Sequence, residues 1–280
     1  MKKLVNIGCG LVFHEEWINL DLYPASSSVK KCDISNGLPF ADNTIDATYS
    51  SHVLEHFSPE MGKHFLAEQY RVLKPGGIIR VVVPDLENIC TNYLHQLGAN
   101  NELCEQKGSF RHYYAVLELV DQLSRHKSGG LIMEFWKSCD SEAQKYVVER
   151  NGQEAQNVIT EKPGNGPNAL RRIPFGIKQK LGDLLANAGF TMLSKLKRRD
   201  VKECYDLGVF RLSGEVHRFM YDRILLRDSL REAGFSEIRK VDSLASSIPS
   251  FETFQLDEIN GKKRKPESLY MEAKKVCSTH

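Results

Sequence analysis

Short apolar segments alternate with helix-like segments over the first 90 residues of the chain. Such alternation is typical of a parallel sheet whose strands are connected by helices. The apolar stretches of the first and last segments are nearly continuous, as expected for strands that are covered on both faces. The pattern predicts five strands, at residues 4–8, 17–22, 29–34, 45–50 and 77–84.

The segment between the last two of these strands predicts a helix with both ends marked. Ser58 is a suitable N-cap, apolar residues recur at helical spacing after it, and Pro75-Gly76-Gly77 stops the helix. The connection at residues 9–17, in contrast, is shorter than the usual crossover between parallel strands. A helix in that connection is therefore limited to a turn or two.

The alternation is lost between residues 86 and 214, where several segments have the apolar spacing of helices. We therefore predict a helical insertion at 86–214 that interrupts a core made of residues 1–85 and 215–280. Because this insertion leaves the sheet at the carboxyl end of the fifth strand, where open parallel sheets bind ligands, it should cover an acceptor site.

The sheet pattern returns after the insertion. Residues 218–235 predict a helix, for which Gly234 is a stop signal. Two further strands are predicted at residues 238–244 and 269–276. The complete pattern is that of an α/β fold with a sheet of seven strands.

Composition indicates an ordinary globular protein of 280 residues, with 41% hydrophobic and 26% charged residues. No apolar run approaches the roughly 20 residues that a membrane helix requires. The start, Met1-Lys2-Lys3 followed by a short apolar stretch, indicates a first strand rather than a signal peptide, so we expect the cytoplasm. Seven scattered cysteines without a C-x-x-C pair favour neither a disulfide framework nor a zinc ribbon, and no metal ligand is assigned.

Basic residues are concentrated at positions 171–202, where nine Lys and Arg face only Asp183 and Asp200. Such a cluster attracts anions, including phosphorylated or nucleotide-linked molecules. The alternative interpretation is a solvated face of helices, which basic runs commonly form.

The Gly8-Cys9-Gly10 turn follows the first predicted strand. A dinucleotide fingerprint would require a third glycine where Phe13 stands, and an acid about twenty residues after the turn, whereas Asp21 is much nearer. A pyrophosphate is therefore disfavoured. A nucleoside without phosphates fits, since a glycine turn admits a ligand close to the backbone and a carboxylate can accept both ribose hydroxyls.

Four segments in this order resemble class I S-adenosylmethionine-dependent methyltransferases of the type 11 branch. They are "NIGCG" (6–10), "NLDL" (19–22), "CDISNGLPFADNTIDATYSSHVLEH" (32–56) and "RVLKPGGIIRVVVPD" (71–85), and the helix in "GEVHRFMYDRILLRDSLREAGF" also resembles a late helix of that family. The resemblance does not cover the insertion. It implies a Rossmann-like fold with a mostly parallel seven-stranded sheet, helices on both faces, and S-adenosylmethionine as cofactor.

The resemblance also assigns roles to the cofactor-binding residues. The backbone of the first turn would run close to the methionine and ribose parts of the cofactor, and Asp21 would bind the ribose hydroxyls. Asp33 would accept a hydrogen bond from the adenine amino group, and the end of the fourth strand would line the methionine. Asp33 has a second interpretation, as a helix cap. The full set is Gly8, Cys9, Gly10, Asp21, Leu22, Asp33, Ile34, Ser50, Ser51 and His52.

Methyl transfer requires an acceptor held in line with the methyl group, and an alcohol acceptor must also lose a proton. We predict His56 as the base, one helical turn beyond His52 and on the same side of the segment. In the similar phosphoethanolamine methyltransferases a histidine at this place works with a tyrosine near the N-terminus, which this chain lacks before Tyr23. The alternative role of the Glu-His pair is to order the start of the following helix.

Further catalytic and substrate-binding candidates come from the later segments. His217 and Tyr221 join His56 as predicted catalytic residues, and Tyr113, Tyr114 and Tyr221 are the candidates to replace the missing tyrosine. The predicted substrate-binding residues are His56, Arg218, Tyr113 and Tyr114. The aromatic residues of the insertion have a second interpretation, as helical core.

The function that the sequence favours is O-methylation of a small sugar, nucleotide-linked or phosphorylated acceptor, with a loose association to surface polysaccharide biosynthesis. An RNA or protein substrate and a non-catalytic binding module remain alternatives. Nucleic acid is disfavoured because the Asn/Asp-Pro-Pro-Tyr type of motif is absent where "SSHVLEH" stands. Whether the chain forms a homo-oligomer is left open.

Overall fold

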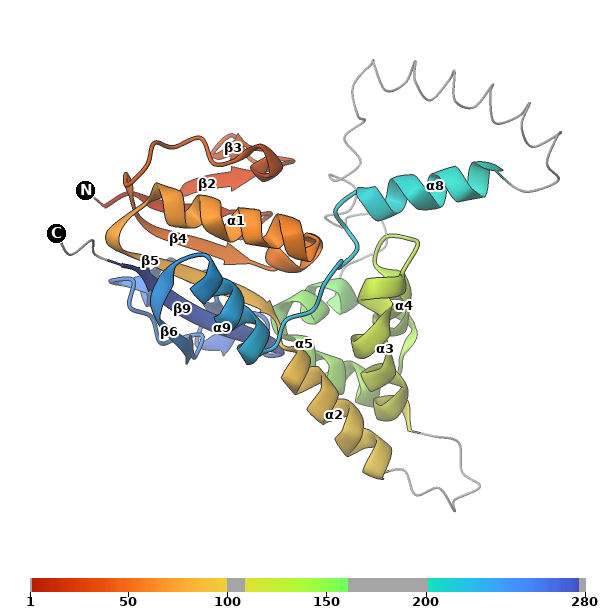
Figure 1. The fold of residues 1–280 in the computed structure, drawn as a ribbon. Helices are drawn as coiled ribbons and strands as arrows, with labels where there is room; N and C mark the ends of the chain where they lie inside the picture. Colours follow the sequence, from red (N-terminus) through yellow and green to blue (C-terminus); the bar gives the residue numbers. More distant parts are fainter. Residues whose placement is uncertain (1, 100–108, 161–200, 277–280) are drawn as a thin grey trace.

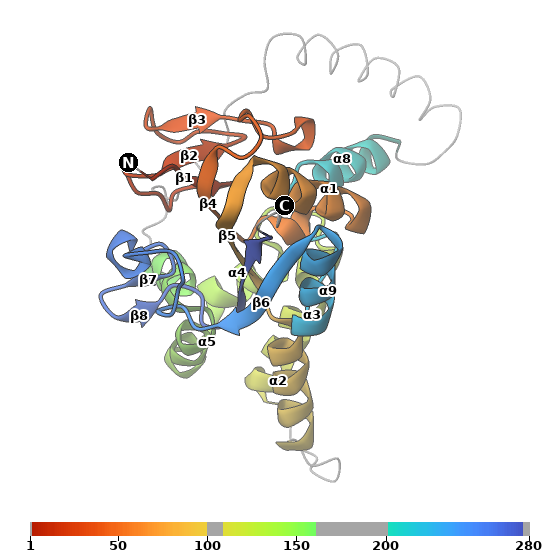
Figure 2. The same ribbon diagram turned by 60° about the vertical axis from the view of Figure 1, so that its left-hand side comes forward.

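A computed structural model describes residues 2–99, 109–160 and 201–276. Its main element is a seven-stranded sheet in the order β3-β2-β1-β4-β5-β9-β6 (Figures 1 and 2). All neighbours are parallel except β9, which runs antiparallel to both β5 and β6, so the predicted mostly parallel sheet is confirmed. The strands are β1 Leu4–Ile7, β2 Ile18–Asp21, β3 Val29–Lys31, β4 Ile45–Ser51, β5 Leu73–Pro84, β6 Phe235–Val241 and β9 Ser268–Lys275.

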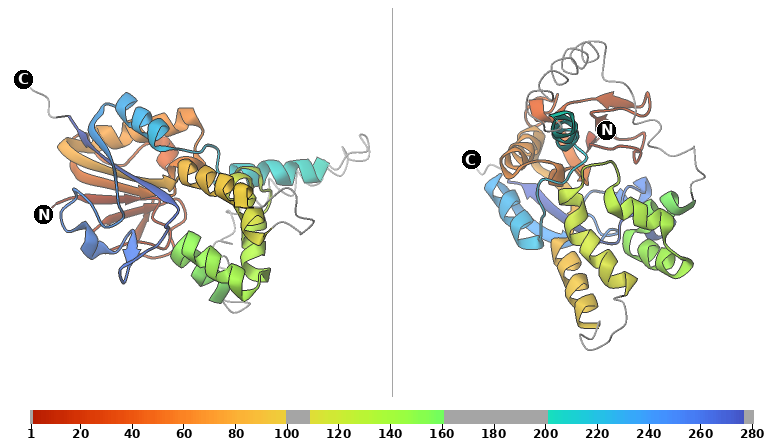
Figure 3. Two further views of the ribbon diagram at one scale, coloured as in Figure 1. Left: turned by 90° about the horizontal axis from the view of Figure 1, so that it is seen from below. Right: turned by 90° about the vertical axis from the view of Figure 1, so that its right-hand side faces the viewer.

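Two helices cover one face of the sheet, α1 (Pro59–Val72) and α9 (Arg223–Glu232) (Figure 3, left). The Ser58 hydroxyl caps α1 by accepting a hydrogen bond from the Met61 N–H at 3.3 Å, as predicted. The helix ends earlier than the Pro-Gly-Gly signal, because Leu73 already pairs with Ile45 and starts β5. Residues 9–17 contain turns and no helix, in agreement with the short connection.

Helix α9 begins at Arg223, five residues later than the sequence predicts. The Asp222 carboxylate caps it by accepting from the N–H groups of Ile224 and Leu225 at 2.9 and 2.8 Å. Tyr221 instead pairs with Asp85 as a β-bridge. The residues before the cap therefore cross the ends of the strands in extended form, which places His217 near the loop after β4.

The other face of the sheet is covered mainly by residues 242–257, with the short 3₁₀ helix η3 (Phe251–Phe254), followed by the hairpin β7 (Glu258–Ile259) and β8 (Lys262–Lys263). In the described residues, therefore, α1 and α9 cover one face of the sheet, and the short helix η3 lies on the other.

Arg80 of β5 holds this covering segment. Its side chain is 0% exposed and donates to the carboxylates of Asp257 and Glu272, both at 2.8 Å. It also donates to three backbone carbonyl groups between residues 242 and 245. A buried guanidinium is tolerated because all its donors have such acceptors.

The helices between β5 and α9 lie beyond the carboxyl ends of the parallel strands (Figure 1). Their shared core contains Tyr114, Leu117, Trp136 and Val147. The limits of the predicted insertion remain a prediction, and most of the basic stretch 171–202 lies outside the described residues. None of the helices in the described part of the chain has the length and apolarity needed to cross a bilayer. The elements are α2 Leu86–Ala99, α3 Phe110–Ser124, α4 Gly130–Ser138, α5 Ser141–Thr160 and α8 Val201–Leu212.

Replacing Arg80 with Met should lower the free energy of unfolding by about 3–5 kcal/mol, because two buried carboxylates would lose their cation. Arg239→Met is the matched control, since its half-exposed side chain reaches the same Glu272 at 3.5 Å and should matter by less than about 1 kcal/mol. Urea unfolding followed by circular dichroism measures both. Equal effects of the two substitutions would contradict the role given to Arg80.

Candidate functional site

The turn after β1 adopts a conformation that favours glycine at both ends. Gly8 has φ +67° and Gly10 has φ +55°, in the left-handed region. A Cβ on Gly8 would lie 2.5 Å from Cγ2 of Val53, so this glycine lets the turn pack against the loop after β4. A Cβ on Gly10 would meet nothing within 4 Å. Gly10 therefore borders open space, as a ligand-contacting position should.

Asp21 at the end of β2 is fixed against this turn. One of its carboxylate oxygens accepts from the Gly10 N–H and the other from the Tyr23 N–H, both at 2.8 Å. A carboxylate oxygen accepts more than one hydrogen bond, so both oxygens keep capacity for ribose hydroxyls. Cys9 lies within the same turn. Burial, together with the Asp21 charge, raises the pKa of the Cys9 thiol to about 12, which keeps the thiol neutral.

The predicted adenine-binding residues lie at the ends of β2 and β3. Leu22 is 39% exposed, and Ile34 is partly buried against the core. Asp33 caps η1 (Ile34–Asn36), accepting from the Ser35 N–H at 3.1 Å and from Asn36 Nδ2 at 3.0 Å. The structure thus gives Asp33 the capping contacts of the alternative interpretation, and its adenine contact remains a prediction.

Ser50, Ser51 and His52 follow one another at the carboxyl end of β4. The Ser50 hydroxyl is buried and has no hydrogen-bond partner in the part of the chain described. His52 has φ +55°, so it does not share a helix with His56, whose helix η2 spans Leu54–His56. The prediction that the two histidines lie one helical turn apart is therefore wrong.

Both histidines nevertheless lie near one carboxylate, Glu55, which the sequence analysis did not select. Glu55 is 0% exposed, and burial raises its pKa to about 8. The Nδ1 atom of His52 lies 3.3 Å from its Oε1, and His52 Nε2 shares a hydrogen bond of 2.8 Å with the Ser268 hydroxyl. Burial also lowers the pKa of His52, so its ring is neutral near pH 7.

His217, which follows the insertion in the sequence, lies near the same carboxylate. Its Nε2 lies 3.9 Å from Glu55 Oε1, and its ring meets the His56 ring edge-on with 4.8 Å between centroids. The Arg218 N–H donates to the Glu55 carbonyl at 2.7 Å, and the His217 N–H donates to the Gln122 carbonyl at 3.0 Å. We call Glu55, His56 and His217 the Glu55 cluster.

Tyr221 borders this cluster. Its hydroxyl packs against α1 so closely that a Cβ on Gly62 would lie 2.9 Å from it. Burial, with a smaller contribution from the Glu55 charge, raises the Tyr221 pKa to about 12, so this residue is a proton donor rather than a base. Arg218 itself is exposed.

The two tyrosines of α3 have different environments. Tyr113 is 51% exposed, so an acceptor could reach it. Tyr114 is 0% exposed, contacts Asn151, and accepts from Trp136 Nε1 at 3.0 Å. The prediction of Tyr114 as a substrate-binding residue is therefore corrected: its ring and hydroxyl belong to the helical core.

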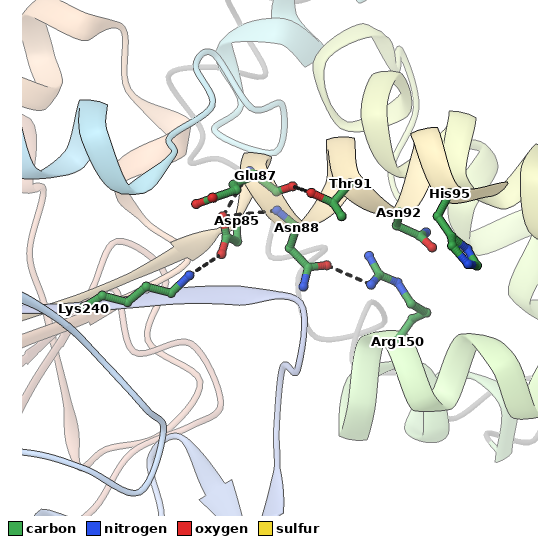
Figure 4. Close-up of a pocket in the computed structure, with 8 residues that line it drawn as sticks. All are labelled: Asp85, Glu87, Asn88, Thr91, Asn92, His95, Arg150 and Lys240. Carbon is green, nitrogen blue, oxygen red and sulfur yellow. Dashed lines mark hydrogen bonds and ion pairs between the residues drawn. The ribbon is translucent and has the colours of Figure 1, made fainter. Parts of the chain in front are cut away.

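A polar pocket of about 430 Å³ lies where β5 meets α2 (Figure 4). Lys240 Nζ is 3.2 Å from the Asp85 carboxylate, and Arg150 donates to the Asn88 amide oxygen at 2.8 Å. A second pocket, of about 350 Å³, lies between residues 11–14 and 253–256. Neither is lined by the predicted cofactor residues. The first is lined by Asp85, Glu87, Asn88, Thr91, Asn92, His95, Arg150 and Lys240.

The comparison with protein families agrees with this arrangement. A family model described as a methyltransferase domain, type 11, matches residues 6–81, which include the turn, Asp21, β4 and the Glu55 carboxylate. This match supports a class I methyltransferase domain of type 11 in the part of the chain that carries the turn and β4. The same match supports S-adenosylmethionine as the cofactor. No curated protein matches the sequence.

Among solved structures, this chain is similar to a protein solved with the Trm112 methyltransferase activator of Haloferax volcanii. The identity is 12%, the match covers 99% of this chain and 83% of that chain, and the TM-score is 0.37. An S-adenosylmethionine-dependent methyltransferase from Thermotoga maritima has 13% identity, coverages of 98% and 83%, and a TM-score of 0.37. One from Archaeoglobus fulgidus has 14% identity, coverages of 98% and 86%, and a TM-score of 0.34. Scores this low carry no argument about substrate.

Replacing Asp21 with Ala should weaken S-adenosylhomocysteine binding about 10- to 100-fold, because hydrogen bonds from the ribose hydroxyls to a charged group would be lost. Isothermal calorimetry measures the affinity. Asp42→Ala is the control, since its exposed carboxylate pairs with Arg71 on α1 and should leave the affinity unchanged. Unchanged binding by the Asp21 variant would remove Asp21 from the cofactor site.

Proposed function

We propose that this methyltransferase transfers a methyl group to a hydroxyl of a small polar acceptor bound beside the Glu55 cluster. The observation that supports this best is the position of the cluster. Glu55 and His56 of the cluster follow β4 closely, and β4 pairs with β1, whose end carries the Gly8–Gly10 turn. Because parallel strands end at one edge of the sheet, a cofactor on the turn would lie next to the cluster.

The cofactor would rest on the turn with its ribose at Asp21. Gly10 offers open space beside that carboxylate, and the unpartnered hydroxyl of Ser50 offers a donor and acceptor at the neighbouring strand end. Leu22, with its exposed side chain, would pack against the adenine. The methyl group would then point past β4 towards the loop that carries His56.

The reaction is an in-line displacement. The acceptor oxygen attacks the methyl carbon, the carbon–sulfur bond breaks, and its electron pair returns to sulfur, which becomes a neutral thioether. The acceptor proton leaves through the Glu55 cluster to water. The main contributions of the protein are the alignment of the two reactants and the removal of that proton.

A polar, hydroxyl-bearing acceptor fits the surroundings of the strand ends. The pocket in Figure 4 offers two carboxylates, two amide side chains, the Thr91 hydroxyl, the His95 imidazole, Arg150 and Lys240. Such a lining donates and accepts hydrogen bonds without a large net charge, which suits a sugar or a sugar carrying a phosphate. This supports the sugar, nucleotide-linked or phosphorylated class that the sequence favours, including precursors of surface polysaccharides.

The cysteines support a reducing compartment, and we propose the cytoplasm. Cys9, Cys32, Cys90, Cys139 and Cys204, all within the described residues, are unpaired thiols. Disulfides are rare in the cytosol, where thiols are kept reduced.

A product screen tests the proposed function. The enzyme is incubated with S-adenosylmethionine and with nucleotide sugars, sugar phosphates or RNA, and products are read by mass spectrometry as a gain of one methyl group. We expect methylation of a sugar-containing acceptor, with weak dependence on salt. A methylated RNA, with activity falling steeply as salt rises, would favour the nucleic-acid alternative. Failure to bind either S-adenosylmethionine or S-adenosylhomocysteine would overturn the enzyme assignment.

Replacing His56 with Asn should lower kcat by about 100-fold or more, because proton removal by a positioned group contributes about that much. The affinity for S-adenosylhomocysteine should stay within about twofold, since His56 lies on the acceptor side. His126→Asn, at an exposed histidine beyond the end of α3, should change neither quantity. Loss of both turnover and cofactor binding in the His56 variant would show that this residue orders the loop.

A further inference from the structure

The Glu55 cluster has the composition and spacing of a metal site. One ligand atom from each of Glu55, His56 and His217 can be chosen so that all three lie within 4.8 Å of one another. One carboxylate with two imidazoles is a ligand set that binds divalent transition metals and leaves coordination positions open. We propose that this cluster binds one divalent first-row transition metal ion beside the acceptor, in contrast to the sequence analysis, which assigned no metal ligand.

The first support is the burial of polar atoms that have no hydrogen bond. Both carboxylate oxygens of Glu55 are buried, with no hydrogen-bond partner in the described part of the chain. Glu55 is 0% exposed and the His217 side chain beside it is 6% exposed. Buried polar groups are normally satisfied, so two such oxygens on one carboxylate indicate a missing partner.

The second support is electrostatic. A buried carboxylate is costly unless a cation balances it. Lys265, whose charge acts on Glu55, forms its ion pair with the Glu154 carboxylate, at 3.0 Å. Within the described residues, the ion-pair partners of Glu55 are the imidazoles of His52 and His217, at 3.3 and 3.9 Å from its Oε1. A divalent ion held by the cluster would place a positive charge directly beside the carboxylate.

The geometry requires only a small adjustment. Two ligands about 2.1 Å from a shared ion stand about 3.4 Å apart at a tetrahedral angle. The His217 Nε2 to Glu55 Oε1 distance is 3.9 Å, so these side chains need to approach by about 0.5 Å. His52 is placed to orient Glu55, because its Nδ1 lies 3.3 Å from Oε1 while Ser268 holds the other ring nitrogen. Such supporting contacts are typical of metal sites.

A metal here would define how the cluster removes the acceptor proton. An ion with open positions binds a hydroxyl oxygen and lowers its pKa, so that the proton passes to water. His56 would then act as a ligand rather than as the base itself. The role of the metal in proton removal rests on the proposed function, because that function places the acceptor beside the cluster. Metal binding by the cluster does not depend on the proposed function.

Metal binding is tested with cobalt(II) and zinc(II) on the full chain after treatment with a chelator, without cofactor or acceptor. We expect one equivalent of cobalt(II) to give visible absorption bands of a four- or five-coordinate site, and zinc(II) to displace it. Glu55→Gln and His217→Asn should each weaken binding by about 100-fold or more, since each removes a ligand. His126→Asn should leave binding unchanged. Circular dichroism confirms that each variant is folded.

Two results would overturn the metal proposal. One is wild-type protein that takes up no stoichiometric cobalt(II), and the other is binding that persists in both Glu55→Gln and His217→Asn. Calorimetry with S-adenosylhomocysteine on the same samples separates this failure from that of the proposed function. Wild-type protein that binds S-adenosylhomocysteine but no metal would contradict the metal site alone.

Discussion

Two backbone hydrogen bonds to a single carbonyl group hold the candidate site together. The Glu55 carbonyl accepts from the N–H groups of Arg218 and Phe219, at 2.7 and 3.2 Å. These bonds tie the segment that follows the insertion to the loop after β4. Because of them, His217 meets His56 and the Glu55 carboxylate although the two segments are far apart in sequence. The site is therefore formed by the return of the chain across the strand ends.

Arg80 and Glu55 are two buried ionisable side chains that differ in one respect. Arg80 is surrounded by acceptors, since Asp257, Glu272 and several carbonyl groups take its donors. Glu55 is equally buried, yet its oxygens have no hydrogen bond within the described residues. A buried ionisable group with all its hydrogen bonds made fixes the fold, as Arg80 does for the second face of the sheet. A buried ionisable group without hydrogen bonds, at the carboxyl edge of a parallel sheet, indicates a ligand-binding site.

Much of the fold was predictable from the sequence because it depends on local patterns. Nearly continuous apolar runs marked β1 and β5, Ser58 marked the start of α1, and the short connection after β1 excluded a long helix there. The start of α9 was not predictable from apolar spacing, which continues upstream of Asp222. Only the bridge between Tyr221 and Asp85, a tertiary contact, shows that the upstream residues are extended.

The candidate site was predictable in part, for a similar reason. Histidines were selected by their chemistry, but Glu55 resembled an ordinary acidic residue at the start of a helix, and its burial follows from packing. Tyr114 was selected as an aromatic residue, although only the structure distinguishes it from the exposed Tyr113. The sequence left two roles open for Asp33, adenine binding and helix capping. Only capping depends on neighbouring residues alone, and the structure has those capping contacts.

A crystal structure with S-adenosylhomocysteine tests the central claim most directly, because it locates the cofactor relative to both strand ends. The account predicts that the ribose hydroxyls meet the Asp21 carboxylate and that the sulfur faces the Glu55 cluster. A ligand that occupies another pocket, or whose sulfur points away from Glu55, would contradict it.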